Sequence, residues 1–91
     1  MNVRAHVLVT GRVQGVFFRS ETNIQAKILN VKGWIRNLPD GRVEAVFEGE
    51  EAAVKKLIDF CRKGPPEAKV TNVNVLQEAF TGEFRSFTAR G

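Results

Sequence analysis

The order of two apolar periodicities constrains the fold of this chain more than any other feature. Some segments alternate apolar and other residues, as strands do, and others repeat apolar residues every three or four positions, as amphipathic helices do. The expected strands are 3–9, 31–38, 42–48, 70–76 and a short 84–89; the expected helices are 19–29 and a segment that opens at 49–51 and stops at 64. This β-α-β-β-α-β order with a short last strand predicts an α+β, ferredoxin-like split βαβ sandwich, with two helices on one face of an antiparallel sheet.

Local signals mark where these segments end and which way their side chains point. Asn30 follows the first helix, where a residue in the left-handed conformation commonly ends a helix. Residues 38–41, Leu-Pro-Asp-Gly, predict the turn between the second and third strands. In the fourth strand Val73 and Val75 are expected in phase with each other, and Val70 out of phase with them.

Composition narrows the classes of protein that remain. With 91 residues, the chain is expected to form one domain over 1–91. It has no apolar run as long as a membrane span and no signal-peptide pattern, so we expect a cytoplasmic protein. A single cysteine, Cys61, and a single histidine, His6, exclude an internal disulfide and a Cys/His zinc site. The formal charge of +4 permits an anionic partner without naming one.

The segment 9–19 joins the first strand to the first helix through two glycines four residues apart, and it ends in Arg19. Such a loop can turn several backbone N–H groups toward one point, and the start of a helix adds a positive dipole end. An arginine there offers a planar set of donors that matches phosphate oxygens. The segment therefore favours either a phosphate-sized anion site or an ordinary strand-to-helix turn with a surface arginine.

Asn37 stands at the end of the second strand, on the same side as the expected inward-facing residues Val31, Gly33 and Ile35. A buried amide without partners costs about 1–3 kcal/mol, so its position needs a reason. Asn37 could cap the following turn, or it could orient a water molecule or a substrate.

Three stretches together resemble the acylphosphatase family over nearly the whole chain. They are residues 9–19, Val-Thr-Gly-Arg-Val-Gln-Gly-Val-Phe-Phe-Arg; residues 33–37, Gly-Trp-Ile-Arg-Asn, followed by Gly41-Arg42-Val43 and Gly49; and Gly64-Pro65-Pro66 with Val70 and Val73. The chain departs from the family pattern at Ile35, at Asn30, where glycine is usual, and in residues 87–89, which offer less apolar bulk than the family's last strand.

The resemblance implies hydrolysis of acyl phosphates to a carboxylate and inorganic phosphate. It implies that Arg19 holds the phosphate and that Asn37 positions the attacking water. Backbone N–H groups of the loop would complete the phosphate site, and they belong to Gln14, Gly15, Val16, Phe17 and Phe18.

The resemblance also implies that no metal or organic cofactor is needed. The expected partner is a small-molecule acyl phosphate, with inorganic phosphate as product and weak inhibitor. Nucleic acid and membrane are not expected partners, and the chain is expected to be a monomer. A shallow phosphate site is expected to discriminate little between acyl groups.

Two alternatives from other classes share this topology. One is a ferredoxin-like RNA-binding module, which would need aromatic residues on the open face of its central strands. The third strand, 42–48, offers one aromatic and two acids instead. The other is a non-catalytic regulatory module, like the acylphosphatase-like modules of larger hydrogenase-maturation proteins.

Overall fold

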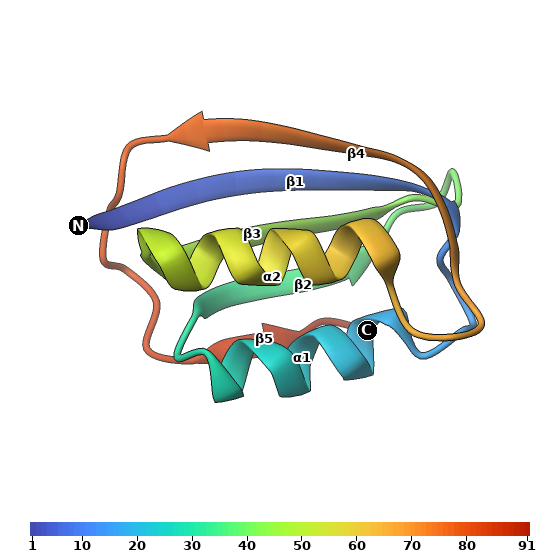
Figure 1. Ribbon diagram of the computed structural model, residues 1–91, viewed down its shortest axis with the longest axis horizontal. Coiled ribbons are helices and arrows are strands. Elements are labelled where there is room, and N and C mark those ends of the chain that lie inside the picture. Colours follow the sequence, from blue (N-terminus) through green and yellow to red (C-terminus); the bar gives the residue numbers. More distant parts are fainter.

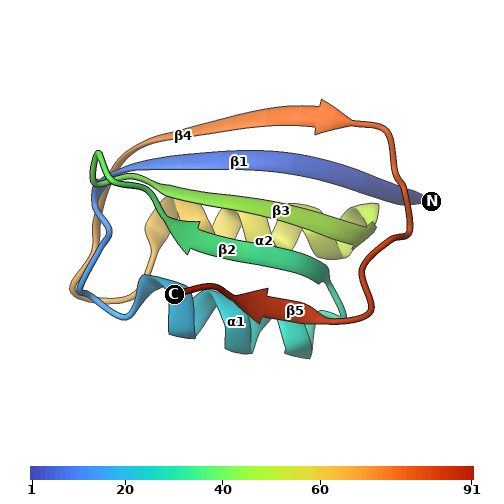
Figure 2. The same cartoon turned by 180° about the vertical axis from the view of Figure 1, so that it is seen from behind.

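A computed structural model describes all residues, 1–91, and contains every expected helix and strand (Figure 1). In chain order they are β1 (Asn2–Arg12), α1 (Phe18–Ile28), β2 (Lys32–Asn37), β3 (Val43–Glu50), α2 (Glu51–Lys63), β4 (Lys69–Glu78) and β5 (Phe87–Ala89). The strands form one sheet in the order β4-β1-β3-β2-β5, and both helices cover the same face of it (Figures 1 and 2). The ferredoxin-like α+β prediction is confirmed.

The last strand differs in detail from the expectation. It covers three residues, Phe87–Ala89, instead of 84–89, and it pairs parallel to β2 while the other neighbours pair antiparallel. The sheet is therefore mixed. Figure 2 shows the reason: after β4 the chain crosses the end of the sheet that holds the N-terminus and enters β5 at the opposite edge. Residues 79–85 form this crossing, and regular pairing with β2 begins only where the Ser86 carbonyl oxygen accepts a hydrogen bond from the Gly33 N–H, at 3.1 Å.

A β-bulge changes the expected register of β4. The pairing of β1 with β4 shifts between Thr10 and Gly11, so that Thr10 lies opposite Asn72 but Gly11 lies opposite Val70. One residue of β4 is skipped, which returns Val70 to the side that packs on the core, along with Val73 and Val75. The prediction that Val70 is out of phase was wrong for this reason.

Side chains from both helices and the inner face of the sheet form one apolar core. One apolar stripe along α2 is buried as a whole, and it consists of Val54, Leu57, Ile58 and Cys61. Burial raises the pKa of the Cys61 thiol to about 12. The thiol therefore acts as a small apolar group and not as a nucleophile.

The turns and helix ends form as their residue types predict. Asn30 adopts a left-handed conformation with φ of 58° just beyond α1, and Gly41 has φ of 97° in the turn between β2 and β3. This turn, the β1–α1 loop and the C-terminus all lie at the same end of the molecule (Figures 1 and 2). The fold thus brings the loop and the end of β2 to one place.

Candidate active site

The loop between β1 and α1 presents a row of unused backbone donors. Its conformation requires left-handed backbone at Gly15, with φ of 74°, and at Phe17, with φ of 65°. For Phe17 this conformation costs about 1–2 kcal/mol relative to ordinary backbone. No backbone N–H group of residues 14–18 donates a hydrogen bond within the protein. Several N–H groups in sequence at a helix start form a local anion-binding geometry.

Arg19 lies in the first turn of α1, next to this loop. One of its terminal nitrogens donates a hydrogen bond to the carbonyl oxygen of Arg90, just beyond β5. The Arg90 guanidinium lies 4.5 Å from the ring centroid of Trp34 on β2, a cation–π contact that holds the C-terminal segment against the sheet. No carboxylate lies within ion-pair distance of Arg19. The guanidinium therefore has no acidic partner within the protein.

Asn37 is the last residue of β2 and pairs with Val43 at the start of β3. Its side-chain oxygen Oδ1 is buried and has no hydrogen-bond partner in the protein. A buried acceptor without a donor destabilises the folded protein by about 1–3 kcal/mol. The fold therefore keeps this arrangement at a cost in stability. A donor from outside the chain would remove that cost. The hypothesis of a turn-capping role predicts a partner for this oxygen, and none is present.

Arg19 and Asn37 line the same surface pocket, whose volume is about 400 Å³. The nine lining residues are Val13, Gly15, Phe17, Phe18, Arg19, Ser20, Asn23, Asn37 and Ala89. Five of the residues predicted from the sequence are therefore brought together. The other two, Gln14 and Val16, are not among the lining residues, although their N–H groups also lack acceptors.

The Gln14 side chain fastens the loop to the neighbouring turn. Its Nε2 donates to the carbonyl oxygens of Leu38, at 2.7 Å, and Arg42, at 2.9 Å. These two residues flank the turn that follows Asn37. One side chain therefore fixes the donor row of the loop relative to the amide of Asn37.

Sequence reasoning missed three polar or small residues of the pocket. Ser20 and Asn23 follow Arg19 by one and four positions, and a residue four positions away on a helix shares its face, so periodicity could have found Asn23. Ala89 reaches the pocket only because β5 pairs with β2, where Ala89 lies opposite Ile35. No local signal in the sequence predicts that pairing.

Comparison with known proteins identifies the relatives of this chain. A sequence model of the acylphosphatase family matches residues 5–89. The chain belongs to the acylphosphatase family. An acylphosphatase of Pelotomaculum thermopropionicum is 58% identical over 84 residues, which cover 92% of this chain and 91% of that protein.

Solved acylphosphatases have the same fold. The crystal structure of acylphosphatase from Bacillus subtilis gives a TM-score of 0.93 at 32% identity, with 98% of this chain and 99% of that chain covered. The acylphosphatase from Coxiella burnetii gives 0.92 at 38% identity, with 98% and 93% covered. Matches over whole acylphosphatases favour an enzyme over the RNA-binding and non-catalytic alternatives.

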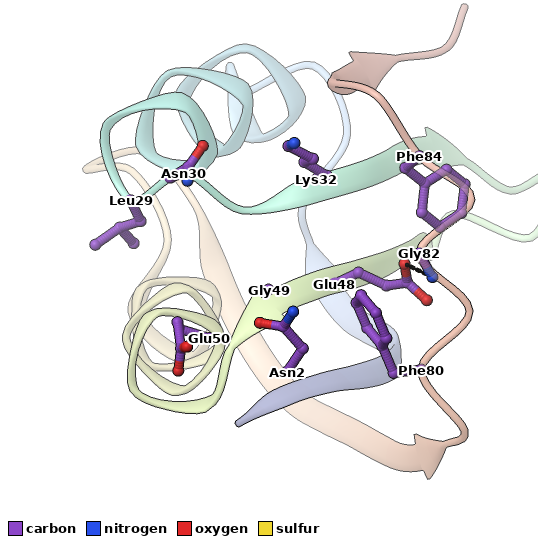
Figure 3. Close-up of a pocket in the computed structure, with 10 residues that line it drawn as sticks. All are labelled: Asn2, Leu29, Asn30, Lys32, Glu48, Gly49, Glu50, Phe80, Gly82 and Phe84. Carbon is purple, nitrogen blue, oxygen red and sulfur yellow. Dashed lines mark hydrogen bonds between the residues drawn. The ribbon is translucent and has the colours of Figure 1, made fainter.

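A second hollow, of about 230 Å³, lies at the other end of this acylphosphatase-family fold (Figure 3). Its floor includes the Glu48 carboxylate, which is 3% exposed and accepts hydrogen bonds from Thr81, Gly82 and Arg4. Burial alone would raise the pKa of Glu48, but these bonds outweigh it and the pKa is lowered. This carboxylate is ionised and fully engaged in fastening the chain between β4 and β5, so it offers no general acid or base.

No helix is long and apolar enough to cross a membrane. No group of three or more His, Cys, Asp and Glu side chains is arranged to hold a metal ion.

Proposed function

We propose that this chain hydrolyses acyl phosphates in the pocket shared by Arg19 and Asn37. The reaction follows from membership of the acylphosphatase family. The observation that carries the assignment of residues is the buried, unpartnered Oδ1 of Asn37 in the same pocket as a guanidinium without an acidic partner.

The phosphoryl group binds between the loop and Arg19. Its charged oxygens accept hydrogen bonds from the free N–H groups of residues 14–18 and from the guanidinium. These donors are fixed before the substrate arrives, because the loop conformation and the Gln14 bonds already hold them. Fixed donors stabilise charge on the equatorial oxygens during phosphoryl transfer without any cost of rearrangement.

Asn37 holds the attacking water. A water O–H donates to the free Oδ1, which satisfies the buried acceptor and fixes the water beside the phosphorus. The water oxygen forms the new bond to phosphorus, and the bond from phosphorus to the acyl oxygen breaks. The electron pair of that bond leaves with the carboxylate, which is a good leaving group and needs no protonation.

The proton of the water passes to an oxygen of the phosphoryl group itself. The pocket lining contains no histidine, aspartate, glutamate, cysteine or lysine that could act as the base. The amides and the guanidinium of the pocket are donors that suit an anion. The pocket lacks the carboxylate or imidazole ligands of a metal ion, so the proposed hydrolysis does not depend on a metal. A pH–rate profile of kcat/KM checks the proton's route: an essential enzyme group titrating near neutrality would contradict it.

The assay is hydrolysis of an aryl acyl phosphate by the wild type, with and without a chelator, and by Arg19→Gln and Asn37→Ala. We expect turnover that does not respond to the chelator, and a loss of at least about a hundredfold in each variant. Arg62→Gln and Asn74→Ala are matched controls, because both side chains are exposed and lie outside the pocket. The controls are expected to retain wild-type activity.

Loss of activity in the chelated wild type would contradict metal independence. Full activity in Asn37→Ala or Arg19→Gln would remove that residue from the mechanism. Inorganic phosphate is expected to be a weak competitive inhibitor, since it occupies the product position. The monomeric state, the cytoplasmic location and the lack of nucleic-acid binding stay predictions, which gel filtration, cell fractionation and a filter-binding assay test.

A further inference from the structure

We propose that the side chain of Phe17 binds the acyl group of the substrate and makes the enzyme select uncharged, apolar acyl groups. This inference rests on the proposed function, since it concerns the same pocket. It adds a role for a side chain whose residue otherwise contributes only a backbone N–H group.

Phe17 is an exposed aromatic ring at the border of the site. It lines the pocket of Arg19 and Asn37 and is 68% exposed, whereas the other aromatic residue there, Phe18, is 1% exposed and belongs to the core. Its backbone is left-handed, a conformation in which glycine or asparagine would be less strained. A large exposed ring in a strained position adds nothing to the packing of the core. We therefore expect its role to be a contact at the surface that it faces.

The geometry of the reaction directs the acyl group to this ring. In-line displacement requires the acyl oxygen to leave from the side of phosphorus opposite to the water. Asn37 ends β2, and the other exposed apolar group of the pocket, Ala89, lies on the adjoining strand β5. Phe17 lies on the loop and helix side instead. An acyl group that leaves the phosphate away from Asn37 therefore reaches the Phe17 ring.

The surface beyond the ring determines which acyl groups fit. Phe17 also borders a neighbouring hollow lined by Pro65 and Pro66 and by two acids, Glu21 and Glu67. The prolines extend the apolar surface, whereas the two carboxylates repel an acyl group that carries a second carboxylate. The preferred class is an aromatic or branched aliphatic acyl phosphate without further negative charge.

Selectivity is measured as the ratio of kcat/KM for benzoyl phosphate to that for acetyl phosphate. Phe17→Asn removes the ring and keeps a residue that tolerates left-handed backbone. We expect the ratio to fall about tenfold in this variant, the size of effect that one aromatic contact gives. Ile28→Ala is the matched control, since Ile28 is 71% exposed on α1 but outside the pocket, and its ratio is expected to stay at the wild-type value.

The charge of the acyl group is tested with 4-carboxybenzoyl phosphate against benzoyl phosphate, in the wild type and in the double variant Glu21→Gln, Glu67→Gln. Comparing the same two acyl phosphates in both proteins cancels their different intrinsic reactivity. We expect the relative kcat/KM for the carboxylated acyl phosphate to rise about two- to fivefold in the double variant at low salt, and less at high salt.

The outcomes separate this inference from the proposed function. If the wild type hydrolyses neither acetyl nor benzoyl phosphate, the proposed function itself fails. If the wild type hydrolyses both and the ratio in Phe17→Asn matches that in Ile28→Ala, the acyl-binding role of Phe17 is wrong while the hydrolase assignment stands. If the relative kcat/KM for the carboxylated acyl phosphate is the same in the double variant as in the wild type, the acyl group does not extend past the ring, and the charge selectivity is overturned.

Discussion

Replacing Glu48 by glutamine tests how the crossing between β4 and β5 is held. The Glu48 carboxylate is 3% exposed and accepts four hydrogen bonds. The donors are the Thr81 backbone N–H and hydroxyl, both at 2.9 Å, the Gly82 N–H at 3.1 Å and an Arg4 guanidinium nitrogen at 3.2 Å. This crossing delivers β5 to the edge of β2 and with it the carbonyl that holds Arg19.

The expected loss in the free energy of unfolding at pH 7 is about 2–4 kcal/mol. Glutamine keeps one acceptor oxygen and turns an amide group toward donors, so at least one buried N–H loses its partner. Arg4 keeps ion pairs with Glu78 and Glu83, which places the loss below that of an isolated buried ion pair. For a chain of this size the loss corresponds to a fall in Tm of about 10–25 °C.

The same substitution changes the response to acid. Hydrogen bonding lowers the pKa of folded Glu48 below its ordinary value of 4.5, despite burial, which acts in the opposite direction. Because the pKa of Glu48 is lower in the folded than in the unfolded protein, its ionised carboxylate stabilises the fold at pH values above the unfolded pKa. This stability is lost as the pH falls through the folded pKa. The difference in unfolding free energy between the wild type and Glu48→Gln is therefore expected to become smaller below about pH 4.5.

Urea unfolding of both proteins at pH 7 and at several values below pH 4.5 measures these quantities. The control is Glu78→Gln, whose carboxylate is 41% exposed, accepts one hydrogen bond, from Arg4 at 2.9 Å, and lies 3.9 Å from His6 Nδ1. Its loss is expected to stay below about 1 kcal/mol. The reasoning is refuted if Glu48→Gln loses no more than this control at pH 7. A difference that stays constant through the acid range would refute the role assigned to the ionised carboxylate.

Three further predictions concern the core and the loop. Cys61, with its raised pKa of about 12, is expected to resist a thiol reagent at pH 8 until urea unfolds the chain, and rapid labelling of the native protein would contradict its burial. Gly33→Ala would bring a Cβ atom to 1.9 Å from the Val46 carbonyl oxygen and is expected to abolish folding. Gly41→Ala, with open space around the Cβ atom, is expected to cost only about 1–2 kcal/mol of unfolding free energy. Equal circular-dichroism melting curves for the two variants would contradict this. Gln14→Ala is expected to cost about 1–2 kcal/mol of unfolding free energy and to lower kcat/KM, because the loop loses two hydrogen bonds to the β2–β3 turn, whose Leu38 and Arg42 carbonyl oxygens keep only their backbone donors. Unchanged activity would show that the loop does not need these bonds.

Local patterns were sufficient to predict most of the fold, and they marked Arg19 and Asn37 as candidate site residues without deciding their roles. The helix α2 and the left-handed Asn30 depend on residues that are near one another in the chain, and both formed as predicted. Arg19 and Asn37 could be paired because a strand-to-helix loop and a strand end meet at the same edge in this topology. The sequence resemblance then supplied the chemistry.

Long-range pairing accounts for the features that were not predicted. The parallel addition of β5 depends on a crossing that the buried Glu48 fastens, and no alternation within 84–89 reveals it. The bulge that returns Val70 to the core depends on how β1 and β4 align across the sheet. The Arg90 carbonyl reaches Arg19, and Ala89 reaches the pocket of Arg19 and Asn37, only through these contacts.

The separate roles proposed for Arg19 and Asn37 are tested most directly by measuring kcat and the inhibition constant of inorganic phosphate. Both are measured in the wild type, in Asn37→Ala and in Arg19→Gln. In Asn37→Ala we expect kcat to fall at least about a hundredfold while the inhibition constant changes less than about threefold, because the amide holds water and not phosphate. In Arg19→Gln we expect phosphate inhibition itself to weaken about tenfold or more. An Asn37→Ala variant that binds phosphate poorly but turns over at the wild-type rate would contradict the assignment of the water to Asn37.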